Sequence, residues 1–315
     1  MRAMPQLRIV VTGATGFIGR ALCERLGDRR TWTALGRTRP PETLPVAFRQ
    51  VDLADPLPAD VIPKGTDVLV HLAAHRGASS DVAGHFRGTA AATLNLCEAA
   101  RKAGVRRVVL ASSTSVYEPG LPASRTLQEE DPRIRARPLA ESFAKKWAED
   151  AARLEALLAE PQSMLWILRP GLVLGEGMRP TSWIRATARR LLSGEPYPLT
   201  GERGHHLGLV ALEDAIEGFI HAIGAEPAPH TEKPGPIWNL VSEVWWERDV
   251  ITALAEAMDI EPKFVPPVTV DPYGWSDHPV SIAGDGGRWL RESGGKRTKP
   301  VAPILAAIAR AERGA

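Results

Sequence analysis

A glycine turn near the start of the chain, between a strand-like and a helix-like segment, is compatible with few folds. Residues 10–19 read Val-Val-Thr-Gly-Ala-Thr-Gly-Phe-Ile-Gly. Glycines at this spacing allow a tight turn, bring backbone N–H groups close to an anion and let the helix lie close to the sheet. The start of the helix adds partial positive charge. An ordinary strand-to-helix turn is the alternative, but the flanking strand and helix favour a site for the paired phosphates of a dinucleotide.

Short apolar runs alternate with helical patterns through the first half of the chain. Strands are expected at residues 7–11, 31–35, 68–72, 107–111 and 164–168, and helices at 17–26, 89–103 and 140–158. The last helix carries an apolar stripe made of Phe143, Trp147, Ala151, Leu154 and Leu158. Apolar strands separated by helices indicate a parallel sheet covered on both faces. We therefore predict an α/β fold with a doubly wound parallel (Rossmann) sheet and a ligand at the carboxyl ends of its strands.

After Pro170 the pattern breaks into pieces separated by Pro and Gly, with helices expected near residues 183–192 and 249–258. Irregular segments of this kind usually form a smaller cap beside a sheet. We therefore predict a dinucleotide-binding Rossmann domain over residues 1–170. Residues 171–315 are expected to form mainly a substrate-binding cap, with some segments returning to the Rossmann sheet.

Composition and charge narrow the functional classes. The 315 residues include 39 Lys plus Arg against 37 Asp plus Glu, and the basic residues are scattered, so nucleic acid is not an expected partner. No apolar stretch is long enough to cross a membrane and the N-terminus has no leader-like pattern, so we expect a soluble, cytoplasmic protein without a membrane partner. Cys23 and Cys97 have no second Cys or paired His at ligand spacing, so neither a disulfide nor a metal site is expected.

Five further segments follow the glycine turn in a fixed order. They are Asp-Leu at 52–53, His-Leu-Ala-Ala at 71–74, Ser-Ser-Thr-Ser-Val-Tyr at 112–117, Leu-Arg-Pro-Gly-Leu-Val-Leu-Gly at 168–175 and Leu-Val-Ala-Leu-Glu-Asp at 209–214. With the turn, this order resembles the extended short-chain dehydrogenase/reductase family, the NAD(P)-dependent sugar-nucleotide epimerases and dehydratases. The resemblance runs over nearly the whole chain and implies a homodimer through the fourth and fifth helices.

The resemblance also implies which residues hold the cofactor. Residues 52–53 would touch adenine, 71–74 would lie under the cofactor, 168–175 would lie beside the nicotinamide, and 209–214 would form a late strand. The implied cofactor-binding residues are Gly13, Thr15, Gly16, Phe17, Ile18, Gly19, Arg37, Asp52, Leu53, Leu72, Ala73, Ala74, Lys145, Pro170 and Val173.

The end of the second strand bears on the choice of cofactor. An acidic side chain there normally binds both ribose hydroxyls and repels a 2′-phosphate. This chain has Gly36 where the family often has Asp, and Arg37 follows with a guanidinium group that suits phosphate. NADP is therefore favoured over NAD. The alternative is that Arg37 and Arg39 are solvated loop charges.

The family's catalytic residues are a Ser or Thr, a Tyr, and a Lys four residues after the Tyr. Ser113 matches the serine, whose implied role is to hydrogen-bond the reacting oxygen. Matching Glu149 to a common family glutamate makes Lys145 the ribose lysine and puts Glu141 in the Tyr position, so the usual Tyr is absent. A second register uses Lys146 and Ser142 and restores no phenol. Glu141 would carry a proton only if burial raised its pKa toward neutrality, and its alternative role is an ordinary ion pair with Lys145.

Other positions also depart from the family pattern. Thr89 stands where a family Asn usually opens a helix, and Leu207 stands near the Arg that often binds a substrate diphosphate. Arg203 or the histidines at 205–206 are candidates to replace that Arg, although solvated loop residues are commoner. His75 and Arg76 follow the strand under the cofactor and are candidates for the cleft, against an ordinary loop role. Tyr117 is more simply a packed structural residue, and one indole of the consecutive pair Trp245 and Trp246 is a candidate to line an apolar substrate pocket or a subunit contact.

Three functional hypotheses follow. The first is an atypical NAD(P)-dependent oxidoreductase or epimerase/dehydratase-like enzyme for a small-molecule substrate, with catalytic Ser113, Lys145 and Glu141. The second is a redox-silent NADP-binding protein that acts as a sensor or a structural component. The third keeps the fold but performs non-redox isomerisation or elimination.

Overall fold

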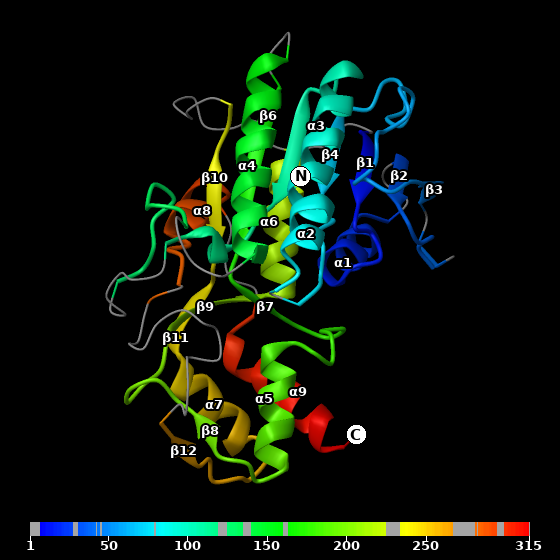
Figure 1. Cartoon of the computed structure of the whole chain (residues 1–315). Helices are drawn as coiled ribbons and strands as arrows, with labels where there is room; N and C mark the ends of the chain where they lie inside the picture. Colours follow the sequence, from blue (N-terminus) through cyan, green and yellow to red (C-terminus); the bar gives the residue numbers. More distant parts are fainter. Residues whose placement is uncertain are drawn as a thin grey trace. The chain divides into compact units, whose positions relative to one another are not determined.

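The computed structural model describes residues 7–27, 31–41, 43–44, 46–78, 80–118, 125–134, 140–159, 163–224, 234–266, 281, 283–294 and 299–314. The chain divides into two compact units (Figure 1). The sheet unit contains Met1–Val116, Pro138–Arg169 and Ile216–Trp238. The second unit contains Tyr117–Arg137, Pro170–Ala215 and Asn239–Ala315.

A seven-stranded sheet forms the centre of the sheet unit, in the order β10-β6-β5-β4-β1-β2-β3. Its strands are β1 Arg8–Thr12, β2 Thr31–Gly36, β3 Ala47–Gln50, β4 Val68–His71, β5 Arg107–Ala111, β6 Met164–Pro170 and β10 Ile237–Leu240. The pairs from β3 to β6 are parallel. Strand β1 lies between β2 and β4, so the chain winds outward from β1 in both directions. This confirms the predicted doubly wound sheet and places its switch point beside the glycine turn.

Helices cover the sheet, and those expected at residues 17–26 and 140–158 span their predicted ranges. The helical segments that contain residues of the sheet unit are α1 Phe17–Leu26, α2 Val82–His85, η2 Phe86–Ala91, α3 Ala92–Lys102, η3 Thr114–Val116, α4 Ala140–Leu158 and α6 Leu212–Gly224. Helices α3 and α4 lie side by side (Figure 1), and an ion pair of 3.2 Å between Arg25 and Glu217 joins α1 to α6. The α-helix expected at residues 89–103 is α3, which begins only at Ala92. The residues before it, Phe86–Ala91, form the π-helix η2.

The core beneath α3 and α4 is built from apolar strand residues and small helix residues. It includes Val10, Leu35, Leu69, Leu96, Leu110, Ala152, Ala156, Leu165 and Ile167. Cys23 and Cys97 are buried free thiols, and burial raises the pKa of each to about 12.

Three of the five residues in the apolar stripe of α4 are exposed to solvent. Trp147, Leu154 and Leu158 are 44%, 54% and 55% exposed, and we call these three residues the outer stripe of α4. The buried face of the helix is instead made of Ser142, Ala144, Ala148, Glu149, Ala152, Glu155 and Ala156. Small side chains allow close packing on that face, and its two buried carboxylates pair with Arg169 and Arg101.

The second unit has its own sheet and core. Its strands are β7 Leu172–Leu174, β8 Tyr197–Pro198, β9 His206–Ala211, β11 Glu243–Trp246 and β12 Phe264–Val265. Its helices are α5 Trp183–Leu192, α7 Glu247–Glu256, α8 Gly287–Glu292 and α9 Val301–Arg313. Strand β9 pairs with β11 in antiparallel and with β7 in parallel orientation. Residues of α5, α7 and α9 share one apolar core.

The late strand expected through Asp214 is shorter than predicted. Strand β9 ends at Ala211 and α6 begins at Leu212, with no linker between them. Asp214 accepts a hydrogen bond of 2.7 Å from the hydroxyl of Ser242, and both residues are buried. The residues matched to the end of the family strand therefore open a helix here.

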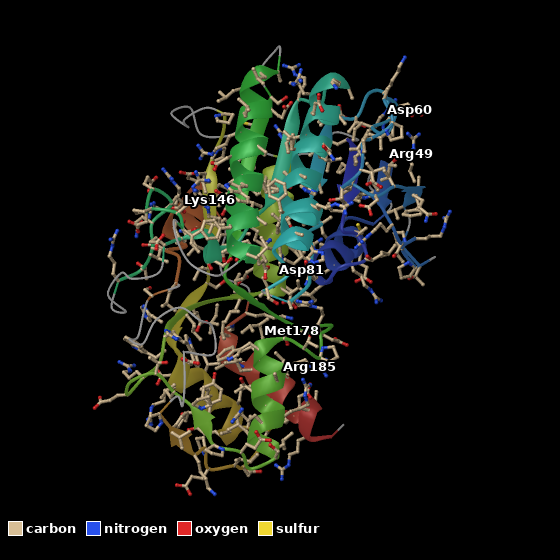
Figure 2. All side chains as sticks on the ribbon, in the orientation of Figure 1. Arg49, Asp60, Asp81, Lys146, Met178 and Arg185 are labelled. Atoms are coloured by element: carbon tan, nitrogen blue, oxygen red, sulfur yellow. The ribbon has the colours of Figure 1, made fainter. Side chains whose placement is uncertain are left out.

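Polar contacts fix edges of both units. At the edge strand β3, the Arg49 guanidinium pairs with the Asp60 carboxylate at 3.4 Å (Figure 2). In the second unit, Arg185 of α5 donates a hydrogen bond of 2.9 Å to the carbonyl of Met178 (Figure 2). Within the described ranges, we find no helix with the length and apolar character needed to cross a membrane.

Candidate cofactor and active site

The glycine turn closes against the loop that follows β4. Gly13 has φ of 72°, a conformation that favours glycine, and a Cβ there would lie 2.8 Å from the backbone nitrogen of Ala73. A Cβ on Gly19 would lie 2.1 Å from the carbonyl oxygen of Gly13. Gly16 is the N-cap of α1 and no side chain caps that end. The first N–H groups of α1 are therefore not occupied by a side-chain cap and fit an anion such as pyrophosphate.

A buried hydrogen-bond chain fixes the carboxyl ends of β1 and β4. The Thr93 hydroxyl donates to the carbonyl of Thr89 at 2.6 Å and lies 2.9 Å from His71 Nε2. Because that hydroxyl proton is used, Nε2 must donate, and Nδ1 then accepts from Thr12 Oγ1 at 2.6 Å. Thr12 Oγ1 in turn accepts from the backbone N–H of Ala73 at 3.2 Å. Burial lowers the pKa of His71 to about 4, and the Lys145 charge adds to the shift.

The residues expected near adenine and the ribose lie at the ends of β2 and β3. Leu53 is buried in the core, whereas Asp52 is exposed and accepts a hydrogen bond of 3.0 Å from Ala54 N–H. Arg37 is exposed, and no other described residue forms an ion pair with it. Arg39 lies over the Phe48 ring at 5.1 Å. A 2′-phosphate therefore has one uncommitted guanidinium group available at the end of β2.

The serine segment follows β5 at the same edge of the sheet. Ser113 Oγ accepts a hydrogen bond of 3.1 Å from Ser115 N–H, so this side chain caps the short helix η3. Ser112 is 5% exposed, and its hydroxyl has no hydrogen-bond partner among the described residues. The sequence offered two adjacent serines, and the structure shows that the hydroxyl without a partner belongs to Ser112.

Helix α4 carries the lysine and the glutamate that stand in the family positions. Burial lowers the pKa of Lys145, the nearby Glu141 charge opposes this shift, and the Arg76 charge adds to it. Glu141 is exposed in the first turn of α4, so it lacks the burial that a proton-carrying role requires. No ion pair joins it to Lys145 in the described part of the chain. In the alternative register, Ser142 is buried on the face of α4 that packs inward.

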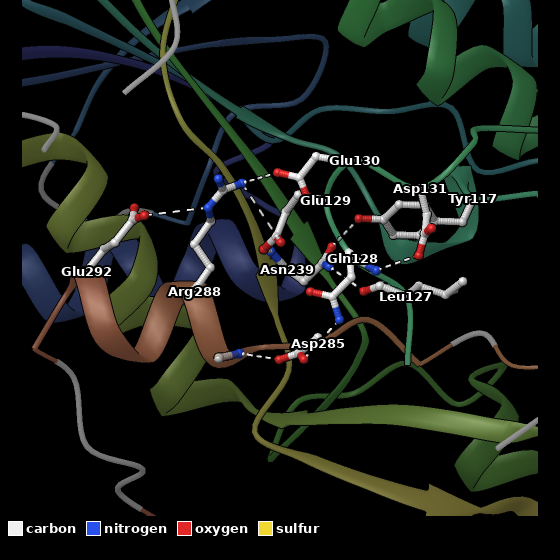
Figure 3. A network of polar contacts seen from close by, with 11 residues as sticks. Tyr117, Leu127, Gln128, Glu129, Glu130, Asp131, Asn239, Asp285, Arg288 and Glu292 are labelled. Atoms are coloured by element: carbon white, nitrogen blue, oxygen red, sulfur yellow. Dashed lines mark hydrogen bonds and ion pairs between the residues drawn. The ribbon is translucent and has the colours of Figure 1, made fainter. Parts of the chain in front are cut away.

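Tyr117 is committed to a polar network in the second unit (Figure 3). Its hydroxyl donates to Asn239 Oδ1 at 2.7 Å, and the residue is 3% exposed. Asn239 donates from its side chain to the Leu127 carbonyl at 3.0 Å and from its backbone to Glu129 Oε1 at 3.0 Å. Burial raises the pKa of Glu129, and Arg288 lies 4.0 Å from its carboxylate. The geometry supports the packed structural role.

The remaining candidate residues of the second unit are also held in packing or polar contacts within that unit. Leu207, near the expected diphosphate-binding Arg, is 1% exposed and belongs to the apolar core. The Trp246 ring lies 4.8 Å from the His206 ring and 4.4 Å from the Arg203 guanidinium carbon. The Trp245 indole donates to Glu243 at 2.9 Å. Pro170 is the last residue of β6, and Val173 lies in β7. Both residues belong to the second unit.

Sequence reasoning missed one pair. The sequence indicates no partner for His75, whereas the structure places its Nε2 2.8 Å from the Asp81 carboxylate. The signal was the cluster of glycines at 77, 84 and 88, which surrounds this pair in the structure.

Comparisons with known proteins show the family and the fold of the chain. The NAD dependent epimerase/dehydratase family matches residues 9–240. A 3-diazoavenalumate denitrifying reductase of a Streptomyces species is 32% identical over 251 residues, which are 71% of this chain and 78% of that protein. A 2-alkyl-3-oxoalkanoate reductase of Stenotrophomonas maltophilia is 30% identical over 177 residues, 54% of this chain and 52% of that protein. The chain thus spans about half the length of this second relative.

A solved structure covers more of the chain. The structure of MoeE5 in complex with UDP-glucuronic acid and NAD has a TM-score of 0.80 and 25% identity to this chain. The likeness covers 98% of this chain and 100% of MoeE5. It extends the similarity beyond the residues that the family comparison matches.

Proposed function

Since the chain belongs to the NAD dependent epimerase/dehydratase family, we propose that it is an NAD(P)-dependent oxidoreductase or epimerase/dehydratase-like enzyme for a small-molecule alcohol or ketone. The observation that carries this proposal is the glycine turn at the switch point, where Gly13 touches the loop after β4 and α1 begins without a side-chain cap. This geometry suits a pyrophosphate. A nicotinamide cofactor supplies or accepts hydride when bound.

The chain's own residues then bind and orient the reactants. Lys145 is proposed to hydrogen-bond the nicotinamide ribose, and Ser113 the reacting oxygen. Ser112, whose buried hydroxyl has no partner in the described part, is a second donor at the same strand end. Only its position in the family pattern supports Glu141 as a proton carrier. The exposure of the Glu141 side chain argues against this role.

We propose NADP as the preferred cofactor. Arg37 is exposed at the end of β2 and Gly36 contributes no carboxylate there, which suits a 2′-phosphate. MoeE5 carries NAD, so NAD remains the competing choice.

The proposed substrate is a small ketone or alcohol rather than a nucleotide sugar. Leu207 is part of the apolar core, so the usual diphosphate anchor of a nucleotide sugar is missing. Two relatives act on other substrates by name, a 2-alkyl-3-oxoalkanoate and 3-diazoavenalumate. We propose that residues 171–315 mainly supply the substrate-binding cap, and that two copies of the chain associate through the outer stripe of α4.

The test has two steps. Calorimetry with NADPH and NADH first measures binding, and Gly13→Ala is expected to abolish it because the added Cβ meets backbone at 2.8 Å. Absorbance at 340 nm then follows turnover with a 2-alkyl-3-oxoalkanoate, a 3-oxosteroid and UDP-glucuronic acid. No heat with either cofactor would contradict the proposal.

A redox-silent cofactor-binding protein is the second candidate. It is favoured by the Glu at the family Tyr position and by the use of Tyr117 in a structural network. Tight NADPH binding, with no change at 340 nm and no product formed from any member of the substrate set, would support this candidate.

A further inference from the structure

His75 and Asp81 form a hydrogen-bonded pair in the loop between β4 and α2. His75 Nε2 lies 2.8 Å from Asp81 Oδ2, and Asp81 Oδ1 accepts the Gly84 N–H at 2.9 Å. Asp81 is also the N-cap of α2, and its place in the fold is shown in Figure 2. The backbone N–H of His75 donates to Thr89 Oγ1 at 2.9 Å. Both ends of the pair are therefore fixed by backbone contacts.

The surrounding backbone leaves room for this imidazole. A Cβ on Gly77 or Gly84 would lie 2.4 or 2.6 Å from His75 Nε2, and one on Gly88 would lie 2.9 Å from His75 Cβ. The ring also meets the His85 ring edge-on at 4.9 Å. A side chain at any of these three positions would displace the ring, so the His75–Asp81 pair requires glycine there.

The pair lies at the edge of the sheet that holds the candidate cofactor site. His71 at the end of β4 pairs with Thr12 of β1 and Leu110 of β5, so the loops that carry Gly13, His75 and Ser113 leave the sheet side by side. Gly88 and Thr89 belong to the π-helix η2, a rare element that is frequent at functional sites.

Charge and access suit proton transfer. The His75 side chain is 26% exposed, and its Nδ1 has no hydrogen-bond partner among the described residues. The Gly84 N–H and the His75 contact both lower the pKa of Asp81, so this carboxylate stays ionised beside the ring. The titratable groups in contact with His75 are Asp81 and His85. Arg76 follows it in the chain, and the charges of Arg76 and Glu141 act on Lys145 of α4.

We propose that His75, held by Asp81, is the catalytic acid and base that does the work of the missing phenol. This inference rests on the proposed function. Asp81 is a positioning residue that holds Nε2, and Nδ1 faces the reacting oxygen.

In the reducing direction, the carbonyl π bond breaks, the carbon gains hydride and the oxygen takes the proton from His75 Nδ1. A C–H and an O–H bond form, and the reductant is the reduced nicotinamide that the proposed function supplies. His75 is left neutral and regains its proton from solvent through its exposed edge. The oxidising direction is the reverse.

The first test needs no turnover. Carbethoxylation of His75 by diethylpyrocarbonate is followed by mass spectrometry with and without NADPH. We expect NADPH to slow modification of His75 several-fold and to leave His206 of the second unit unchanged. Equal rates at His75 with NADPH shown to be bound would overturn the proposal.

The second test compares variants on whichever substrate the wild-type protein reduces. His75→Asn is expected to lower kcat about a hundred- to ten-thousand-fold with little change in KM or in NADPH affinity. Asp81→Asn should lower kcat less, and Glu98→Gln, which removes an exposed carboxylate paired with Lys102 on α3, should leave it unchanged.

The outcomes separate the two proposals. A wild-type protein that binds no cofactor or converts no substrate contradicts the proposed function and, with it, this role. An active wild-type protein whose His75→Asn variant keeps full kcat overturns the His75 role alone. Loss of kcat in Glu141→Gln but not in His75→Asn would assign the proton to Glu141 and overturn our proposal in the same way.

Discussion

Glu149 on α4 and Arg169 on β6 form a two-pronged ion pair in the core of the sheet unit. Arg169 Nε and Nη2 lie 2.8 and 2.7 Å from the two carboxylate oxygens, and the side chains are 2% and 0% exposed. The pair fixes how α4 sits along β6, and thereby where Lys145 stands one helical turn before Glu149.

Glu149→Gln should lower the free energy of unfolding strongly. The substitution takes both of these charged contacts from a buried guanidinium group, and breaking a buried ion pair typically costs about 3–5 kcal/mol. Urea unfolding followed by circular dichroism measures the change. Glu98→Gln is the matched control, because its ion pair is exposed and should contribute less than about 1 kcal/mol. Equal destabilisation by the two substitutions would contradict the structural role of the buried pair.

Gly36→Asp should move cofactor preference from NADPH toward NADH. Nothing lies within 4 Å of the position of a Cβ at residue 36, so the added carboxylate fits and repels a 2′-phosphate. We expect NADPH to bind at least about tenfold more weakly, or about 1.4 kcal/mol. Fluorescence titration measures both dissociation constants.

Arg37→Ala should weaken NADPH binding and spare NADH, whereas Lys102→Ala on α3 should change neither. Tighter binding of NADH than of NADPH by the wild-type protein would show that Arg37 is only a solvated charge.

Trp147→Glu combined with Leu158→Glu should convert a dimer into a monomer. The outer stripe of α4 exposes large apolar side chains, and Phe86 of η2 extends it through an edge-on contact of 5.4 Å with Trp147. Contiguous exposed apolar surface of this kind marks an interaction site. Sedimentation equilibrium should give twice the 34.1 kDa chain mass for the wild-type protein and the single mass for the variant.

Leu192→Glu, at a residue of α5 that is 38% exposed and outside the stripe, serves as the control for that charge. A wild-type protein that sediments as a monomer would contradict the proposed association.

His71 should make stability fall as the pH falls below about 6.5. Its folded-state pKa of about 4 lies below its ordinary value of 6.5, so the unfolded chain binds the proton more readily. Stability from this group is complete above pH 6.5 and is lost as pH approaches 4, by up to about 3 kcal/mol.

Urea unfolding at pH 7 and at pH 4.5 compares the wild-type protein with His71→Gln, which keeps an acceptor and a donor but cannot titrate. The wild-type protein should lose more stability between the two pH values. An identical loss in both proteins would show that His71 does not carry the effect.

The sequence predicts the elements whose burial pattern is uniform. Strand β5 and helices α1, α4 and α5 begin and end at the expected residues. Four other strands, β1, β2, β4 and β6, differ from their expected ranges by at most two residues at either end. β3 was missed because its four residues are exposed or half-buried and show no continuous apolar run. The boundary between β9 and α6 was misplaced because Ala211 and Leu212 continue the apolar run without a turn residue.

The site is harder to predict than the fold, because its side chains meet across long stretches of sequence. Thr12 and His71 are 59 residues apart and His71 and Thr93 are 22 apart, so spacing could not reveal their hydrogen-bond chain. The outward direction of the α4 stripe also depends on tertiary packing. An amphipathic pattern shows which residues share a face, but not whether sheet, solvent or a second copy covers it.

The two buried thiols have a practical consequence for experiments on this protein. With pKa values near 12, Cys23 and Cys97 are almost wholly protonated in ordinary buffers and offer little thiolate to maleimides, iodoacetamide or oxidants. A single cysteine introduced on an exposed loop would then carry a fluorophore or spin label at one defined place without removal of the native pair.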